Sequence, residues 1–246
     1  LKEYKNNAGK EFRTFTGHTR AINSVAMTSD KKYVLSSSVD RTLKLWNVSR
    51  GTEALKFKGG SDEIYCVTTT PDGKYAMSSG WDKIIRMWNI NKTQLVKTFK
   101  GHTYNISALA VSPDGKYLLS ASWDKTLKLW DINTGEEIRT FKGHSDWIYT
   151  ATITPNGKYG ISGGKDKTVR SWDISSGEEI KIIHVKGDVK SIAASSDNKD
   201  IFAAINFNGI KQFDMNTGKE IKTFKDKYNF IYSVDLSKDG KHLISG

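Results

Sequence analysis

Residues 101–141 read GHTYNISALAVSPDGKYLLSASWDKTLKLWDINTGEEIRTF, and most of the remaining chain repeats this stretch. Four aspartates follow one another at steps of 42 residues, and four tryptophans keep the same step. A fixed period of this length indicates one supersecondary unit that stacks on its own copies. The repeated positions are Asp40, Asp82, Asp124 and Asp166, and Trp46, Trp88, Trp130 and Trp172.

Each repeat predicts four short strands. In the clearest copy, apolar-rich or alternating runs are separated by turn residues such as Pro113-Asp114-Gly115 and Asn133-Thr134-Gly135. The pattern contains no helix signal, so the repeat is typical of one blade of a β-propeller, which must stack on other blades to bury its faces. The expected strands, named a to d in chain order, span 105–111, 116–121, 126–130 and 137–141.

The Gly-His opening and the Trp-Asp ending of the repeat resemble the WD40 family, and the resemblance extends over the whole chain. It implies an all-β fold over residues 1–246: a single WD40-type β-propeller of six four-stranded antiparallel blades, or seven if the chain is a fragment. The expected complete blades span 17–57, 59–99, 101–141, 143–183 and 185–224.

The two ends of the chain are complementary in this alignment. Residues 1–15 match strands c and d of a blade, and residues 227–246 match strands a and b. We therefore predict that they complete the sixth blade, which would remove exposed sheet edges. The blade at 185–224 has lost most landmarks, since Phe213 replaces the repeated Trp and Ala203 replaces the repeated Ser.

Composition limits the possible functions. The longest apolar runs are too short to span a membrane, and a single cysteine, Cys66, rules out a disulfide framework, so we expect an intracellular, cytoplasmic protein. His and Cys are too sparse for a metal site, and we expect no cofactor. The net charge is +11, but only seven of the 38 basic residues are Arg, the residue best suited to phosphate recognition. We interpret most of this charge as a solvated surface, which makes nucleic acid an unfavoured partner.

A Ser, His and Asp combination recurs with Trp in three blades. Such a set suggests an acyl-transfer enzyme, but a catalytic site occurs once and this set occurs three times in register. The WD40 resemblance implies that these side chains form a buried hydrogen-bonded tetrad in each blade, which predicts a protein that is not an enzyme. The tetrads are His18, Ser36, Asp40 and Trp46; His102, Ser120, Asp124 and Trp130; and His144, Ser162, Asp166 and Trp172.

The WD40 resemblance also implies where partners bind. In that family, contacts concentrate three and five residues past the His and just before the turn Asp, on the face formed by the d–a and b–c loops. Seven of the seventeen residues at these positions are aromatic, against 11% for the chain. Aromatic anchors are typical of protein interfaces. The expected partner-binding residues are Glu63, Tyr65, Trp81, Asn105, Trp123, Trp147, Tyr149, Phe230 and Tyr232.

We therefore expect a non-catalytic, monomeric scaffold or sensing module that binds another protein or peptide on this face. The central contacts are Tyr65, Trp81, Trp123, Trp147 and Tyr149, and neighbouring acidic residues favour an apolar ligand with a basic side chain. Three alternatives stay open. The rings pack on neighbouring loops, the Lys-rich surface binds nucleic acid or acidic lipid, or the central channel holds a catalytic set.

Overall fold

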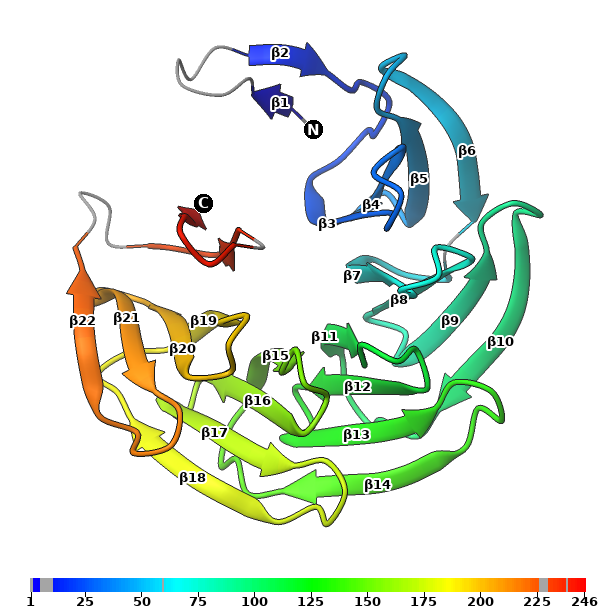
Figure 1. Ribbon diagram of the computed structural model, residues 1–246. Coiled ribbons are helices and arrows are strands. Elements are labelled where there is room, and N and C mark those ends of the chain that lie inside the picture. The colour runs from blue at the N-terminus through cyan, green and yellow to red at the C-terminus, as the bar shows by residue number, and fades with distance from the viewer. Residues whose placement is uncertain (1, 5–10, 59, 226–229, 238) are drawn as a thin grey trace. The chain divides into compact units, whose positions relative to one another are not determined.

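The computed structural model describes residues 2–4, 11–58, 60–225, 230–237 and 239–246. The chain divides into two compact units, Leu1–Gly101 and His102–Gly246. All regular elements of the described residues are β-strands, shown in Figure 1. The all-β prediction is therefore confirmed.

The first unit holds two four-stranded antiparallel sheets and one two-stranded sheet. Blade one consists of β3 (Ile22–Met27), β4 (Tyr33–Ser38), β5 (Thr42–Asn47) and β6 (Thr52–Lys58). Blade two consists of β7 (Ile64–Thr69), β8 (Tyr75–Gly80), β9 (Ile84–Asn89) and β10 (Gln94–Lys100). The two-stranded sheet pairs β1 (Lys2–Tyr4) with β2 (Glu11–Thr14).

The second unit holds three four-stranded antiparallel sheets and a second two-stranded sheet. Blade three consists of β11 (Ile106–Val111), β12 (Tyr117–Ser122), β13 (Thr126–Asp131) and β14 (Glu137–Lys142). Blade four consists of β15 (Ile148–Ile153), β16 (Tyr159–Gly164), β17 (Thr168–Asp173) and β18 (Glu179–His184). Blade five consists of β19 (Val189–Ala194), β20 (Asp200–Ile205), β21 (Gly209–Asp214) and β22 (Glu220–Phe224), and β23 (Val234–Leu236) pairs with β24 (Leu243–Ser245).

The strands predicted for residues 101–141 agree with β11 to β14 to within one residue at each end. The prediction that the two ends of the chain share a blade concerns β1 and β2 of one unit and β23 and β24 of the other, and it stays a prediction. Parts of both ends, residues 1, 5–10, 226–229 and 238, lie outside the described residues.

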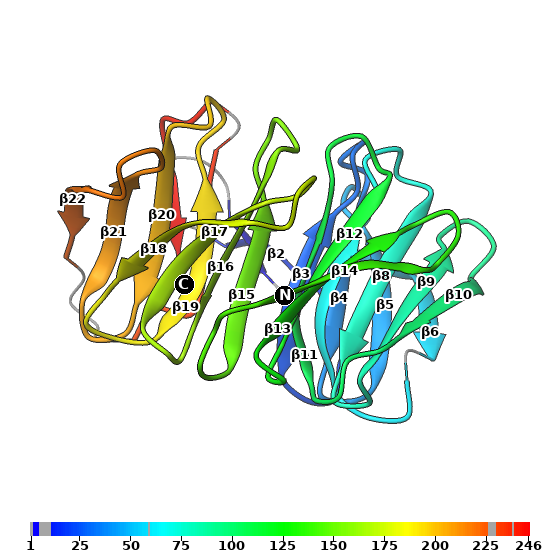
Figure 2. The same ribbon diagram turned by 90° about the horizontal axis from the view of Figure 1, so that it is seen from below.

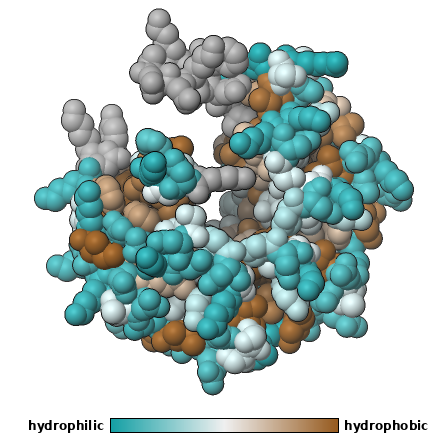
Figure 3. All heavy atoms as spheres, in the orientation of Figure 1, coloured by the Kyte–Doolittle hydropathy of each residue, from teal (hydrophilic) through white to brown (hydrophobic). Residues whose placement is uncertain are grey.

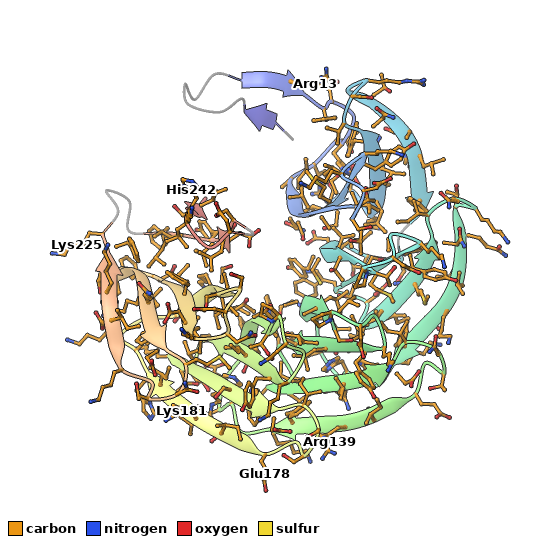
Figure 4. All side chains as sticks on the ribbon, viewed as in Figure 1. Arg13, Arg139, Glu178, Lys181, Lys225 and His242 are labelled. Carbon is orange, nitrogen blue, oxygen red and sulfur yellow. The ribbon has the colours of Figure 1, made fainter. Side chains whose placement is uncertain are left out.

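Neighbouring blades of the second unit bury their apolar faces against each other. Leu119 and Leu129 of blade three share a core with Ile148 and Trp172 of blade four. These side chains are almost fully buried because the alternating strands place one apolar face toward the next blade. Arg139 of β14 adds a polar tie, since its guanidinium donates to the carbonyl oxygen of Ser175 at 3.1 Å, in the turn between β17 and β18 (Figure 4).

The outer strands leave apolar side chains in solvent. Ile138, Ile180 and Ile221 of β14, β18 and β22 are each about half exposed. In Figure 3, apolar residues lie scattered among hydrophilic ones along the edge formed by β14 and β18. Singly exposed apolar residues of this kind are normal for a protein surface.

Every complete blade has a β-bulge at the same place in its first strand. In blade two, Ile64 faces Gly80 and Cys66 faces Ser79, so Tyr65 is the extra residue. Because a bulge redirects a side chain, this irregularity fixes where these residues point. The bulge residues of the five blades are Asn23, Tyr65, Ser107, Tyr149 and Lys190.

The turns follow a regular placement along the blades. Figure 2 shows that the β15–β16 and β19–β20 turns lie at the same end of the second unit. The β15–β16 turn includes Gly157 with φ +73°, where a residue without Cβ avoids strain. Among the expected partner-binding residues of blades two to four, Glu63, Asn105 and Trp147 lie just before the first strand of a blade, and Trp81 and Trp123 lie in the turn after the second strand. Tyr65 and Tyr149 lie within the first strand, at the bulge.

Candidate functional site

Three blades contain a continuous hydrogen-bonded chain from indole to carboxylate. In blade three, the Trp130 indole donates to Ser120 Oγ at 2.8 Å, and His102 lies 2.7 Å from both Ser120 Oγ and Asp124 Oδ2. The His18 and His144 sets have the same connections, with distances of 2.7 to 2.9 Å. Ser36, Ser120 and Ser162 have no exposed area, so the serine at the middle of each network lies inside its blade.

The aspartate of each network is held in its charged form. Burial alone would raise the pKa of Asp166, but hydrogen bonds from His144, Thr168 and the Ser145 amide outweigh it and lower this pKa to about 2. The same balance lowers the pKa of Asp40 and of Asp124 well below the usual range. A charged carboxylate with several donors stiffens the turn that it belongs to.

Blade two uses a different partner for its aspartate. The sequence predicts an incomplete network there because Gly60 replaces the His, but the Arg86 guanidinium lies 2.8 Å from Asp82 Oδ2. A Cβ at Gly60 would lie 2.9 Å from that oxygen and 3.3 Å from Arg86 Nη1, so the missing side chain makes room for the arginine. Blade two therefore lacks the His of the tetrad, as the sequence indicates, and Arg86 is the partner of Asp82 in its place.

A second substitution explains why Arg86 turns toward Asp82. In blades one, three, four and five, the basic residue at this position pairs with a glutamate of the last strand, as Lys128 does with Glu137 at 2.7 Å. In blade two, Leu95 takes the glutamate position opposite Trp88. Arg86 has no glutamate there and pairs with Asp82 instead.

Blade five replaces the polar network with apolar packing. Ala203 and Phe213 occupy the Ser and Trp positions, and both lie buried in one hydrophobic cluster. Phe207 stands at the turn-Asp position, with φ +63° and 65% of its surface exposed. An apolar interior without buried donors needs no tetrad to satisfy it.

The partner-binding positions are brought together in each blade by a backbone hydrogen bond. The Trp123 amide donates to the Asn105 carbonyl at 3.0 Å, and the Lys165 amide donates to the Trp147 carbonyl at 2.8 Å. In blade four this approach needs Gly164, because a Cβ there would lie 2.3 Å from the Trp147 carbonyl oxygen. The fold therefore places the loop before strand a beside the turn after strand b.

The second unit gathers three of the expected anchors into one aromatic cluster. Trp123 and Trp147 stack with ring centroids 4.3 Å apart and an angle of 6°, and Tyr149 meets Trp123 edge-on at 6.4 Å. Tyr104, which sequence reasoning missed, stacks beside Trp123 at 6.1 Å and is 42% exposed. Trp123, Trp147 and Tyr149 are half-buried. We call these four residues the aromatic cluster.

Two lysines lie on the rings of this cluster. Lys165 Nζ is 4.3 Å from the centroid of Trp147 and 3.6 Å from Asp146 Oδ2. Lys190 Nζ is 3.6 Å from the centroid of Tyr149 and 3.1 Å from Asp188 Oδ2. Each ring thus faces an ammonium that is paired with a nearby carboxylate, an arrangement typical of cation–π contacts.

The acidic side chains affect the tyrosine as well. Burial, and then the negative charges of Asp188 and Asp146, raise the pKa of Tyr149. The phenol therefore keeps its proton at neutral pH and can donate or accept a hydrogen bond.

The first unit contains an aromatic pair of the same kind. Trp81 is 37% exposed and donates from its indole nitrogen to the hydroxyl of Tyr65, with ring centroids 6.1 Å apart. Burial raises the pKa of Tyr65, and the charges of Glu63 and Asp62 add to the increase. The Glu63 carbonyl accepts from the Trp81 amide at 3.1 Å, which ties these two positions together.

The remaining expected contacts are placed differently. Asn105 is 1% exposed, so its side chain is buried and is not available for direct contact. Phe230 and Tyr232 are 51% and 67% exposed and stack at 6.4 Å. Phe207, which sequence reasoning missed, meets Phe230 edge-on at 4.8 Å. Its replacement of a repeated Asp is the signal that could have found it.

The comparisons with known proteins agree with this architecture. The model of the WD40 family, described as "WD domain, G-beta repeat", matches more than half of the chain, at residues 9–47, 51–89, 93–131 and 135–173. The chain belongs to the WD40 family. The WD40 repeats explain the recurring tetrads, and proteins of this family serve generally as scaffolds for protein interactions.

Two curated proteins share a short stretch with this WD40 chain. The small ribosomal subunit protein RACK1 of Caenorhabditis elegans is 40% identical over 43 residues, which is 18% of this chain and 13% of that protein. The protein of the same name from Saccharomyces cerevisiae is 42% identical over 43 residues, which is 18% of this chain and 14% of that protein. The shared length is about one repeat.

Metal sites and membrane-spanning helices are both absent from the part of the chain that the structure describes. No group of three or more His, Cys, Asp or Glu side chains among the described residues is arranged to hold a metal ion. Within the same residues, no helix has the length and apolar character that crossing a membrane requires.

Proposed function

We propose that this WD40 chain is a non-catalytic interaction module that binds a segment of another protein through the aromatic cluster. The observation that carries the proposal is the stacking of Trp123 on Trp147, beside Tyr149, at positions where the loops meet the surface. Rigid, half-buried aromatic rings supply large contact area at low entropic cost, and such residues dominate the energy of protein interfaces.

The fold itself does not require these rings. Blade one has Ala21, Asn23 and Val39 at the corresponding positions and still forms the same backbone hydrogen bond, from the Val39 amide to the Ala21 carbonyl at 3.0 Å. Its tetrad is also complete. Folding therefore does not require aromatic residues at these positions of blades three and four, and partner binding explains why they are there.

Other expected residues enter the proposal with different roles. The pair of Tyr65 and Trp81 is a further contact of the same kind, with Glu63 as its acidic neighbour. Phe230 and Tyr232 are exposed enough to contact a partner directly. Asn105 supports Trp123 through its backbone carbonyl.

A peptide selection tests this function. A phage-displayed random peptide library is selected on the whole chain, and the affinities of the recovered peptides are measured by calorimetry. We expect Trp147→Ala to weaken binding by about 2 kcal/mol or more, because a buried aromatic anchor is lost. Trp81→Ala is measured in parallel as a separate test of the first unit's pair.

Lys116→Glu is the matched control. Lys116 lies in the β11–β12 turn, where its ammonium is 3.7 Å from Asp114, and it contacts none of the aromatic rings described above. Its substitution should leave the affinity nearly unchanged. The proposal fails if the recovered peptides respond to Lys116→Glu and ignore Trp147→Ala.

Anion binding is the second candidate function. The net charge of +11 and the ribosomal names of the two relatives favour it. Four of the lysines in the described residues, however, pair with an aspartate of their own turn, as in Lys74 with Asp72 at 3.5 Å and Lys199 with Asp197 at 3.7 Å. Such local pairs reduce the field available to an anion. This function predicts RNA affinity that falls steeply with salt.

A further inference from the structure

Both faces of the Trp147 indole are covered by the chain itself. Trp123 lies parallel to it at 4.3 Å, and the Lys165 ammonium lies over the ring, also 4.3 Å from its centroid. Two groups at that distance occupy opposite faces, because one face has no room for both. A partner that uses Trp147 as an anchor must therefore displace either an indole or an ammonium.

The ammonium is the easier group to displace. The Lys165 side chain is 43% exposed, and its nitrogen is 3.6 Å from Asp146, which is a long contact for an ion pair. Lys190, the lysine that lies over Tyr149, is 18% exposed and donates a hydrogen bond to Asp188 at 3.1 Å. Exposed ion pairs are weak, so moving Lys165 into solvent has a small cost.

We propose that Lys165 is an internal stand-in for a Lys or Arg side chain of the bound segment. This inference rests on the proposed function and specifies its ligand. On binding, Lys165 swings into solvent, and the ligand's cation takes its place on Trp147 and pairs with Asp146. The site is therefore occupied in the free protein by a group with the chemistry of the ligand.

Charge complementarity favours a cation over an acidic ligand. Asp146 and Asp188 lie beside the two rings, and their charges help to raise the pKa of Tyr149. The face of an indole carries negative electrostatic potential, which attracts an ammonium or guanidinium and repels a carboxylate. A guanidinium has the further advantage that it stacks flat on an aromatic face and binds a carboxylate in a forked geometry.

Removal of the positive charge of Lys165 from the site should strengthen the binding of a positively charged ligand. We expect Lys165→Gln to raise the affinity for a basic ligand about threefold or more, because the ligand no longer competes with the internal ammonium. Asp146→Asn should lower that affinity. Lys186→Gln is the matched control, with the same charge change at an exposed lysine just before β19.

The test uses N-acetyl-arginine amide as the probe and the indole N–H signal of Trp147 in the isotope-labelled whole chain as the readout. Trp147→Phe assigns that signal. N-acetyl-citrulline amide, which has the same shape without the charge, should produce little shift, and N-acetyl-glutamate amide should produce none. The arginine probe should shift the signal with saturation, and more tightly in Lys165→Gln than in Lys186→Gln.

The inference is overturned if Lys165→Gln binds the arginine probe no better than Lys186→Gln, if the citrulline or glutamate probe binds as well, or if neither variant responds. The peptide selection separates this failure from failure of the proposed function. Selected peptides that depend on Trp147 but carry acidic residues would leave the function standing and refute the cation site. Selected peptides that ignore Trp147 would refute the function itself.

Discussion

Blades one and four have the same interior and different surfaces. Both contain a complete tetrad, with hydrogen bonds of 2.7 to 2.9 Å, and both have a bulge at the same place in the first strand. At the loop positions, blade one has Ala21, Asn23 and Val39, where blade four has Trp147, Tyr149 and Lys165. The interior residues therefore determine the structure of the blade, and the loop residues vary independently of them.

Acidification should produce the largest effect that the two interiors share. Asp40 and Asp166 have lowered pKa values in the folded chain, about 2 for Asp166 against 3.8 ordinarily, so the unfolded chain binds protons more readily. Their contribution to stability is complete above about pH 5 and is lost as the pH falls toward 2. Denaturant titrations across this pH range should show the loss of stability. Asp40→Asn and Asp166→Asn should each make the free energy of unfolding depend less steeply on pH. Unchanged slopes would contradict the proposed role of the carboxylates.

Removal of the carboxylate at neutral pH should destabilise both blades to a similar extent. We expect Asp166→Ala and Asp40→Ala each to lower the free energy of unfolding by about 2–3 kcal/mol, because the buried histidine loses its partner. Urea denaturation followed by tryptophan fluorescence measures both values. A large effect in one blade alone would show that the two interiors are not equivalent.

Blade two differs from blades one, three and four, because its aspartate pairs with an arginine and not with a histidine. We expect Asp82→Ala to cost about 1–2 kcal/mol, less than Asp124→Ala, since the freed Arg86 is 14% exposed and can reach water, whereas the His102 side chain has no exposed area. The same denaturation experiment applies, with Asp72→Ala in an exposed turn as a control. Equal losses for Asp82→Ala and Asp124→Ala would show that the partner of the aspartate makes no difference.

The repeat predicted the blades well because its signals are local. The step of 42 residues, the turn residues and the alternation of strand c each depend on a few neighbouring positions, and they gave the strands of residues 101–141 to within one residue. The aromatic residues that break the repeat were also visible in the sequence. Two of them, Trp123 and Trp147, proved to stack on each other.

Contacts between blades and between substituted positions were harder to predict. Lys190 belongs to blade five and lies over Tyr149 of blade four, so this contact depends on how neighbouring sheets pack. Arg86 lies 2.8 Å from Asp82 in the blade where Gly60 replaces a His and Leu95 replaces a glutamate, two changes far apart in sequence. The bulge leaves no sequence signal of its own, because its position holds Asn, Tyr, Ser, Tyr and Lys in the five blades.

The smallest expected loss of stability, that of Trp147→Ala, decides whether the aromatic cluster serves binding or folding. The most direct test measures the free energy of unfolding of Trp147→Ala by urea denaturation and compares it with that of Asp166→Ala from the same blade. The account predicts that Trp147→Ala lowers the free energy of unfolding by less than about 1 kcal/mol, as expected for a half-buried surface residue that the fold does not require. A loss as large as that of Asp166→Ala would show that the rings pack for stability, and it would contradict the claim that they are there to bind a partner.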